Sequence, residues 1–216
     1  MYTILIAAGW PVWPLLIISI LALAILFERI WFLQAKRITP PQLLEGAIQL
    51  ASSGALKQLK TAQDATKALS DAAPLGQILA AALVEKAKGG SEEKIIAAMQ
   101  DAAESVTILL ERYLGALATI ATIAPLLGLF GTVVGMIEIF GSHQGVGANP
   151  QQLANGISIA LYNTAFGLLI AIPAYAGWRS LKAMAEKRQR ECDSAAKKLL
   201  AHLNSIWLSH HAFSPK

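Results

Sequence analysis

The stretch Ala121–Met136, ATIAPLLGLFGTVVGM, decides the fold class of this chain. It carries no charge, and it combines one proline and three glycines with two threonines. Soluble helices avoid glycine and internal proline, whereas both are more frequent in membrane-spanning helices. We therefore interpret the stretch as a membrane helix that leaves room for other helices on one side and presents weakly polar groups on another.

The composition of the whole chain agrees with this interpretation. Of its 216 residues, 55% are hydrophobic and 15% are charged, whereas soluble domains carry about 25% charged residues. The single cysteine, Cys192, excludes an internal disulfide and a cysteine-based zinc site. Dinucleotide-binding, P-loop, zinc-protease and nucleophile-elbow motifs are missing from the sequence. We therefore predict no enzyme, no cofactor, no metal site and no nucleic-acid partner.

Three apolar segments are long enough to cross a bilayer, which takes about 20 residues in a helix. The first lies within residues 1–33, the second within 111–141 and the third within 153–178. In the first segment the charges follow the apolar run, so we interpret it as a retained anchor and not as a secretory signal. The predicted fold class is all-α, an integral membrane protein with three transmembrane helices and long helical cytoplasmic extensions.

The positions of the basic residues predict the orientation in the membrane. All eighteen Lys and Arg residues lie in two blocks, Arg29–Arg112 and Arg179–Lys216, and the connection 142–152 has none. Since cytoplasmic segments are rich in Lys and Arg, both blocks are predicted to be cytoplasmic and the connection 142–152 to lie outside. The amino terminus then lies outside and the carboxyl terminus inside.

Two segments outside the membrane are predicted to be helical. Residues 34–110 form a cytoplasmic helical loop domain, and residues 179–216 form a helical tail, for which a loose charged tail is the alternative. Ser91 is typical of an N-cap, followed by acids that suit the helix dipole. No helix breaker occurs between Ser91 and Pro125. The second span is therefore predicted to be continuous with a helix that starts at about residue 92.

Small residues form stripes at helical spacing on the second and third spans. Such stripes let helix backbones approach closely in lipid, where the hydrophobic effect does not hold helices together. The pattern leaves open whether the stripes pack within one subunit or serve a function. Prolines inside the spans free carbonyl groups one turn upstream. The helix-packing candidates are Gly128, Gly131, Gly135, Gly167, Pro125 and Pro173.

Weakly polar side chains on the same spans are candidates for an ion pathway. A threonine in a membrane helix most often bonds a carbonyl one turn back in its own helix, which is the structural alternative. Hydroxyl groups near mid-membrane on both stripe-bearing spans are harder to explain by that bond alone. The pore-lining candidates are Thr132, Thr164, Thr122, Ser158 and Asn163.

The missing charges are as informative as the polar groups. Neither span has Asp, Lys, Arg or His between Tyr113 and Ile137 or from Leu153 to Trp178. A proton path through the membrane needs an ionisable group, so that group must come from a partner helix. The chain's own candidate is Glu138, roughly 39 Å along the helix from Arg112. It is either an exposed interfacial carboxylate or an acid at the outer end of the pathway.

Two segments together resemble a known family. LATIATIAPLLGLFGTVVGM at 117–136, followed by GISIALYNTAFGLLIAIPA at 156–174, is similar to the MotA/TolQ/ExbB proton-channel family. The resemblance covers about residues 110–175. Three spans with a large first cytoplasmic loop resemble the ExbB/TolQ branch, whereas MotA has a fourth span.

This resemblance implies a homo-pentamer in the bacterial inner membrane, with 142–152 as a periplasmic loop and with the second and third spans lining a central pore. The pore would enclose the Asp-bearing helix of an ExbD-like single-span partner, and proton flow would energise a TonB-like transducer for transport across the outer membrane. Thr132 and Thr164 match the pore threonines of the family. A TolQ-like role in envelope integrity and division is the first alternative, and a non-conducting membrane scaffold is the second. A transporter of soluble ligands is disfavoured, because three spans contain no inverted repeat.

The third span departs from the pattern of the resemblance at one position. Many ExbB and TolQ sequences read G-I-x-E-A-L there, whereas this chain has Ile159 where the glutamate stands. Either the acid is dispensable or another residue, such as Glu138, substitutes for it. Which ion is used stays open at this point.

Overall fold

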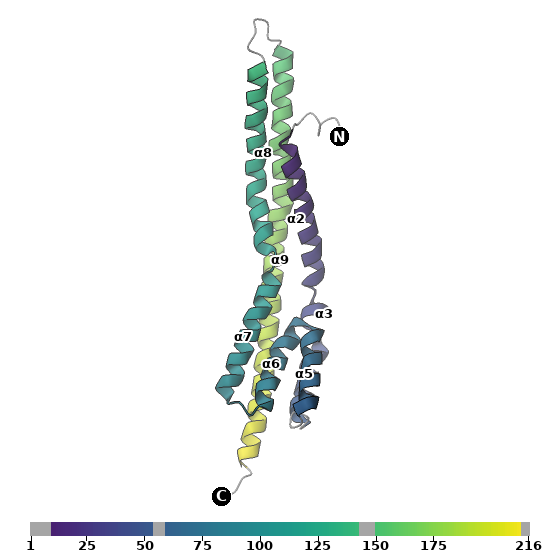
Figure 1. The fold of residues 1–216 in the computed structure, drawn as a ribbon, viewed down its shortest axis with the longest axis vertical. Coiled ribbons are helices and arrows are strands. Elements are labelled where there is room, and N and C mark those ends of the chain that lie inside the picture. Colours follow the sequence, from purple (N-terminus) through teal and green to yellow (C-terminus); the bar gives the residue numbers. More distant parts are fainter. Residues whose placement is uncertain (1–9, 54–58, 143–149, 213–216) are drawn as a thin grey trace. The chain divides into compact units, whose positions relative to one another are not determined.

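The computed structural model describes residues 10–53, 59–142 and 150–212, and every regular element in these ranges is an α-helix (Figure 1). Three helical stretches are long and apolar enough to cross a membrane, and they lie in Val12–Phe32, Glu92–Gly141 and Gly156–Ser205. The predicted all-helical class with three membrane helices is therefore confirmed. The chain divides into two compact units, and both contain part of the last helix.

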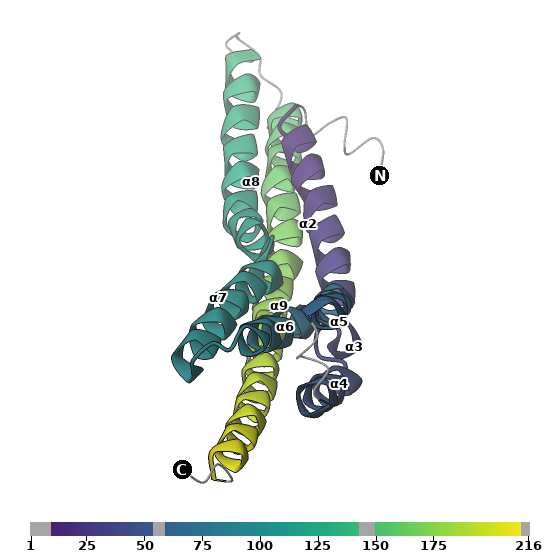
Figure 2. The same cartoon turned by 60° about the horizontal axis from the view of Figure 1, so that its bottom comes forward.

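The first unit contains the membrane helices. It comprises α2 (Val12–Phe32), α8 (Leu114–Ser142) and the first part of α9 (Pro150–Ala212). These three helices lie side by side in both views (Figure 1, Figure 2). The predicted connection 142–152 is shorter than expected, because α9 already begins at Pro150, where a proline fits the first helical turn. Residues 143–149 of that connection lie outside the described residues.

The predicted continuous helix from about residue 92 needs a correction. Helix α7 (Glu92–Glu111) ends before Arg112, and α8 begins two residues later at Leu114. Tyr113 between them has a φ of 64°, in the left-handed region that bulky residues rarely adopt. Neither glycine nor proline marks this break, which is why the sequence pattern did not reveal it.

The second unit is a bundle of shorter helices with the remainder of α9. They are α3 (Ala35–Ile38), α4 (Pro41–Ser52), α5 (Leu59–Ala72), α6 (Pro74–Ala87) and α7. Pro41 and Pro74 each occupy the first turn of a helix, where a missing N–H costs nothing. Ser91 takes the N-cap position of α7, but its side chain makes no capping hydrogen bond. Helix α6 is the centre of this unit, with Leu79 and Leu83 fully buried.

The tail after residue 179 is not a loose chain, since α9 continues without a break to Ala212. Its apolar side is buried in the second unit, with Leu199 and Leu203 at most 1% exposed. Polar contacts tie the same helix to distant segments. Arg188 donates through Nε to the carbonyl of Leu33 at 3.2 Å, and Lys182 bonds Glu111 at 2.5 Å. The alternative of a loose charged tail is therefore wrong for the described part of the tail.

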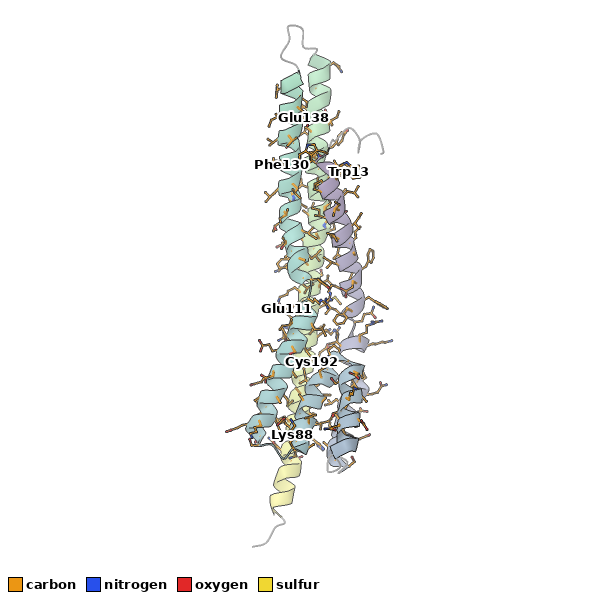
Figure 3. The ribbon with its side chains drawn as sticks, in the orientation of Figure 1. Trp13, Lys88, Glu111, Phe130, Glu138 and Cys192 are labelled. Carbon is orange, nitrogen blue, oxygen red and sulfur yellow. The ribbon has the colours of Figure 1, made fainter. Side chains whose placement is uncertain are left out.

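Cys192 on α9 gives a direct test of this buried side, because it is the single cysteine of the chain and is 1% exposed (Figure 3). Burial, followed by the nearby Asp193 and Glu191, raises the pKa of the Cys192 thiol to about 12. Since the thiolate is the reactive form, we expect maleimide or iodoacetamide to label the folded protein about a thousandfold more slowly than the unfolded chain at pH 8. Mass spectrometry with and without denaturant measures this difference. Equal labelling rates would show that α9 does not pack in this way.

Candidate functional site

The first unit is built on a close crossing of α8 and α9. A Cβ at Gly128 would lie 2.7 Å from the backbone oxygen of Asn163, and one at Gly167 would lie 2.6 Å from the backbone oxygen of Ala124. Real Cβ atoms do not approach other atoms this closely, so the two backbones can meet only because both positions are glycine. The small-residue stripes of the two spans therefore pack against each other inside one chain.

The contact continues toward the end of α8. A Cβ at Gly131 would lie 2.8 Å from the Cβ of Asn163, and one at Gly135 would lie 3.1 Å from the Cβ of Ala160. The side chain of Asn163 is 1% exposed and fills the space beside Gly131. Of the polar candidates, Asn163 thus belongs to the helix crossing itself.

Pro125 and Pro173 lie inside α8 and α9 without ending either helix. Pro125 is partly buried, one residue after Ala124 of the crossing, and Pro173 is exposed. Each removes one intrahelical N–H and leaves a carbonyl one turn upstream without its usual bond.

The hydroxyl groups of three candidate residues bond their own helices, which is the common arrangement for such residues in membrane helices. Each hydroxyl donates its hydrogen to a backbone carbonyl and keeps its oxygen as an acceptor. The bonds run from Thr122 to Thr119 at 2.9 Å, from Thr132 to Leu129 at 2.7 Å and from Ser158 to Ala154 at 3.0 Å.

Thr132 and Thr164 lie on the side of the crossing that faces away from α2. On α8, the ring of Phe130 contacts Trp10, just before α2, at a centroid distance of 6.2 Å. Thr132 is two residues further along, and two residues in a helix turn by about 200°. On α9, Phe166 lines a groove against α2, and Thr164 is again two residues away. Both threonines therefore point away from α2, and Thr164 lies beside Gly128.

Helix α2 covers the other side of α9. The two helices touch where a Cβ at Gly177 would collide with the side chain of Leu26. Beyond that contact they enclose an apolar groove of about 380 Å³, lined by Val12, Leu15 and Pro173 among others. The first span therefore packs on α9 mainly through apolar side chains.

Glu138 lies apart from the threonines, in an exposed position further along α8 than Phe130 and beyond the start of α2 (Figure 3). It is six residues after Thr132, which turns it by about 240° around the helix. Gly135 meets Ala160 and Ile139 meets Gly156, and this register places Ile159 opposite Met136, two residues or about 3 Å along α8 from Glu138. Glu138 directly precedes Ile139 on α8, and Ile159 directly precedes Ala160 on α9, so each is next to a residue of this contact.

The chemistry available at the crossing is that of neutral oxygen atoms and apolar surface. From Leu114 to Trp178 the sequence has two residues of the types Asp, Glu, His, Lys and Arg, namely Glu138 and His143. His143 lies outside the described residues. Among the described residues, no three His, Cys, Asp or Glu side chains come together as a metal-binding group.

Three apolar helices around a glycine crossing define a multi-pass membrane protein. Residues 70–194 match the model of the MotA/TolQ/ExbB proton channel family, which covers α6, α7, α8 and most of α9. The chain belongs to this family, and its relatives place it in the ExbB/TolQ branch. It is therefore a proton channel subunit of the ExbB/TolQ kind.

Individual relatives support this assignment over most of the chain. An ExbB-like biopolymer transport protein of Synechocystis sp. is 31% identical over 96% of this chain and 80% of its own length. Biopolymer transport protein exbB1 of Vibrio cholerae is 32% identical over 93% of this chain and 85% of its own length. The Tol-Pal system protein TolQ of Haemophilus influenzae is 44% identical over a shorter region, 33% of this chain and 32% of its own.

Sequence reasoning missed two aromatic residues and one ion pair that orient the site. Phe130 and Phe166 mark the sides of α8 and α9 that face α2, but their apolar character does not distinguish them from lipid-facing residues. Arg29 belongs to the first basic block, which is predicted to be cytoplasmic, yet it is 2% exposed, pairs with Glu28 and lies over the ring of Tyr113. The one available signal was that a charge so close to the apolar run needs a partner.

Substitution of Gly128 tests the crossing. We expect Gly128→Ala to destabilise the protein by about 1–3 kcal/mol, since the added methyl group would force the two backbones apart. Gly115→Ala is the matched control, because Gly115 is also on α8 and a Cβ there meets nothing within 4 Å. Thermal unfolding in detergent measures both variants. If the two unfold at the same temperature, the crossing is looser than described.

Proposed function

We propose that this chain is the pore-forming subunit of a motor driven by the proton-motive force in the bacterial inner membrane. Several copies, a pentamer by the resemblance, enclose the helix of an ExbD-like partner, and the motor energises a TonB-like transducer for transport across the outer membrane. The amino terminus is periplasmic, and both basic blocks are cytoplasmic. Membership of a proton channel family and the ExbB names of its relatives support this proposal.

The observation that carries the proposal is the shared side of Thr132 and Thr164. Both lie opposite the contacts with α2, on two helices whose backbones touch. An assembly that brings these sides of several copies together would form a ring of threonine oxygens, with α2 on the outside. Thr122 and Ser158 are exposed on the same two helices and would extend the polar lining.

The titrating group of the pathway comes from the partner in this proposal. A relay of protons across a membrane needs a group that binds and releases a proton. Neither threonine can do this near neutral pH, and no acid or base lies between them and the inner end of α8. A carboxylate on an enclosed partner helix fills this requirement.

A TolQ-like role in envelope integrity is the second candidate. It is favoured by the higher identity, 44%, to the Tol-Pal system protein TolQ of Haemophilus influenzae over 73 residues. A scaffold that stabilises partner proteins without conducting ions is the third. The first two share the same mechanism and differ in partner, whereas the third needs no hydroxyl groups.

Replacing both threonines by valine distinguishes a motor from a scaffold. We expect Thr132→Val/Thr164→Val to abolish proton-driven uptake across the outer membrane while the assembly keeps its mass, because valine preserves the shape and removes the oxygen. The matched control is Thr107→Val in α7, which loses a similar bond, to Ala103 at 2.9 Å, outside the predicted spans. Normal uptake by the double variant would make these threonines packing residues.

We further propose that Glu138 stands in for the acid that Ile159 lacks. The two residues lie within about 3 Å of each other along the axis of two adjacent helices, both turned away from the threonines. We expect Glu138→Gln to reduce uptake at least about tenfold if the acid binds the transported proton. In that case Glu138→Gln/Ile159→Glu restores uptake, because the carboxylate returns within about 3 Å along the helix axis. Wild-type uptake by Glu138→Gln would leave Glu138 as an exposed interfacial residue only.

A further inference from the structure

The boundary between α7 and α8 holds a backbone conformation that the local sequence does not explain. Tyr113 has a φ of 64°, although Leu-Glu-Arg-Tyr-Leu contains no residue that favours the left-handed region. A bulky residue in this region costs free energy, and such a conformation persists only where the surroundings compensate for it. We therefore relate the positive φ of Tyr113 to the contacts of its side chain.

Arg29 of α2 supplies that contact. The Cζ of its guanidinium lies 5.2 Å from the centroid of the Tyr113 ring, within the range of a cation–π interaction. Arg29 is 2% exposed, and a charge that is buried this far must be paired. Glu28 pairs with it through two bonds, from Nε at 2.6 Å and from Nη2 at 3.0 Å. The glutamate itself is about half exposed.

Tyr113 in turn sets the start of α8. Its carbonyl accepts the first hydrogen bond of that helix, from the N–H of Leu117 at 3.1 Å. Leu114 and Leu117 follow in the first turn and are at most 2% exposed. A ring held by α2 at one end of this turn and two buried leucines within it together fix the rotation of α8 about its axis.

We propose that Arg29 is a positioning residue of the ion pathway, which, paired with Glu28, holds the ring of Tyr113 and so fixes the start and the rotation of α8. This inference rests on the proposed function, because it takes α8 as the helix that brings Thr132 to the pathway. A rotation of α8 by one residue's step, about 100°, would move Thr132 off the side opposite α2.

The test compares variants that remove the cation or the ring with variants that keep them. Arg29→Gln removes the cation and Tyr113→Leu removes the ring, whereas Arg29→Lys and Tyr113→Phe retain them. Arg37→Gln is the matched control, since Arg37 also lies over an aromatic ring, that of Trp31 at 3.8 Å. Unlike Arg29, both Arg37 and Trp31 are exposed. All variants are measured in the full assembly with its partner.

Two readouts are needed. We expect amide hydrogen exchange in the first turn of α8, at Leu117, to become about tenfold faster in Arg29→Gln and Tyr113→Leu. Proton-driven uptake per assembled complex should fall several-fold in the same two variants. Arg29→Lys, Tyr113→Phe and Arg37→Gln should stay within about twofold of the wild type in both readouts. Wild-type exchange and uptake in Arg29→Gln and Tyr113→Leu would overturn the proposal.

Tyr113→Gly separates the ring from the backbone. Glycine adopts a positive φ without strain but offers no ring. We expect its uptake to fall several-fold, as in Tyr113→Leu. Full uptake would show that the break alone suffices, against the proposed role of Arg29.

If Arg29→Gln does not accumulate in the membrane, Tyr113→Leu and Tyr113→Gly decide, because they bury no new polar group. If even the wild type shows no proton-driven uptake, the proposed function fails, while exchange at Leu117 still decides the role of Arg29.

Discussion

The contact between the backbones of α8 and α9 at Gly128 and Gly167 is the constraint on which the membrane part of this protein depends. In lipid, burial of apolar surface does not hold helices together, so association relies on close packing. Here the packing is so close that a Cβ at either glycine would come within 2.7 Å of a carbonyl oxygen of the other helix. Because neither helix can rotate at the crossing without losing this fit, the crossing sets the direction of the neighbouring side chains on both helices, and the contacts of Tyr113 do so at the start of α8.

The crossing divides the α8–α9 pair into two unlike sides. One side receives α2, through Trp10 on Phe130 and through the apolar groove beside Phe166. The other side carries Thr132 and Thr164 and is not covered by α2. In the proposed assembly around a shared axis, the side that α2 occupies would face outward and the weakly polar side would face the pore.

Much of this arrangement could be predicted from the sequence, because hydropathy and small-residue spacing are local properties. The three spans, the glycine stripes and the helical tail follow from them. The break at Tyr113 could not be predicted, since it depends on Arg29, which lies 84 positions earlier in the chain. The side on which each threonine lies was equally inaccessible, because it is defined by Phe130 and Phe166 against α2. The closeness of Glu138 and Ile159 along the helix axis depends on the register of two helices, which no single-sequence pattern fixes.

The hydrogen bond of Thr132 limits which ion the proposed pathway suits. Its hydroxyl hydrogen donates to the carbonyl of Leu129 at 2.7 Å, so the oxygen faces outward with its lone pairs alone. Such a group accepts hydrogen bonds from a hydronium ion, a water molecule or a protonated carboxyl group, and it has no donor left for an anion. A ring of these oxygens is therefore a poor site for anions and a weak acceptor for protonated groups. In the proposed motor, a weak acceptor would let a partner's carboxyl group pass in its neutral form without trapping it, which a charged residue at the same place would not.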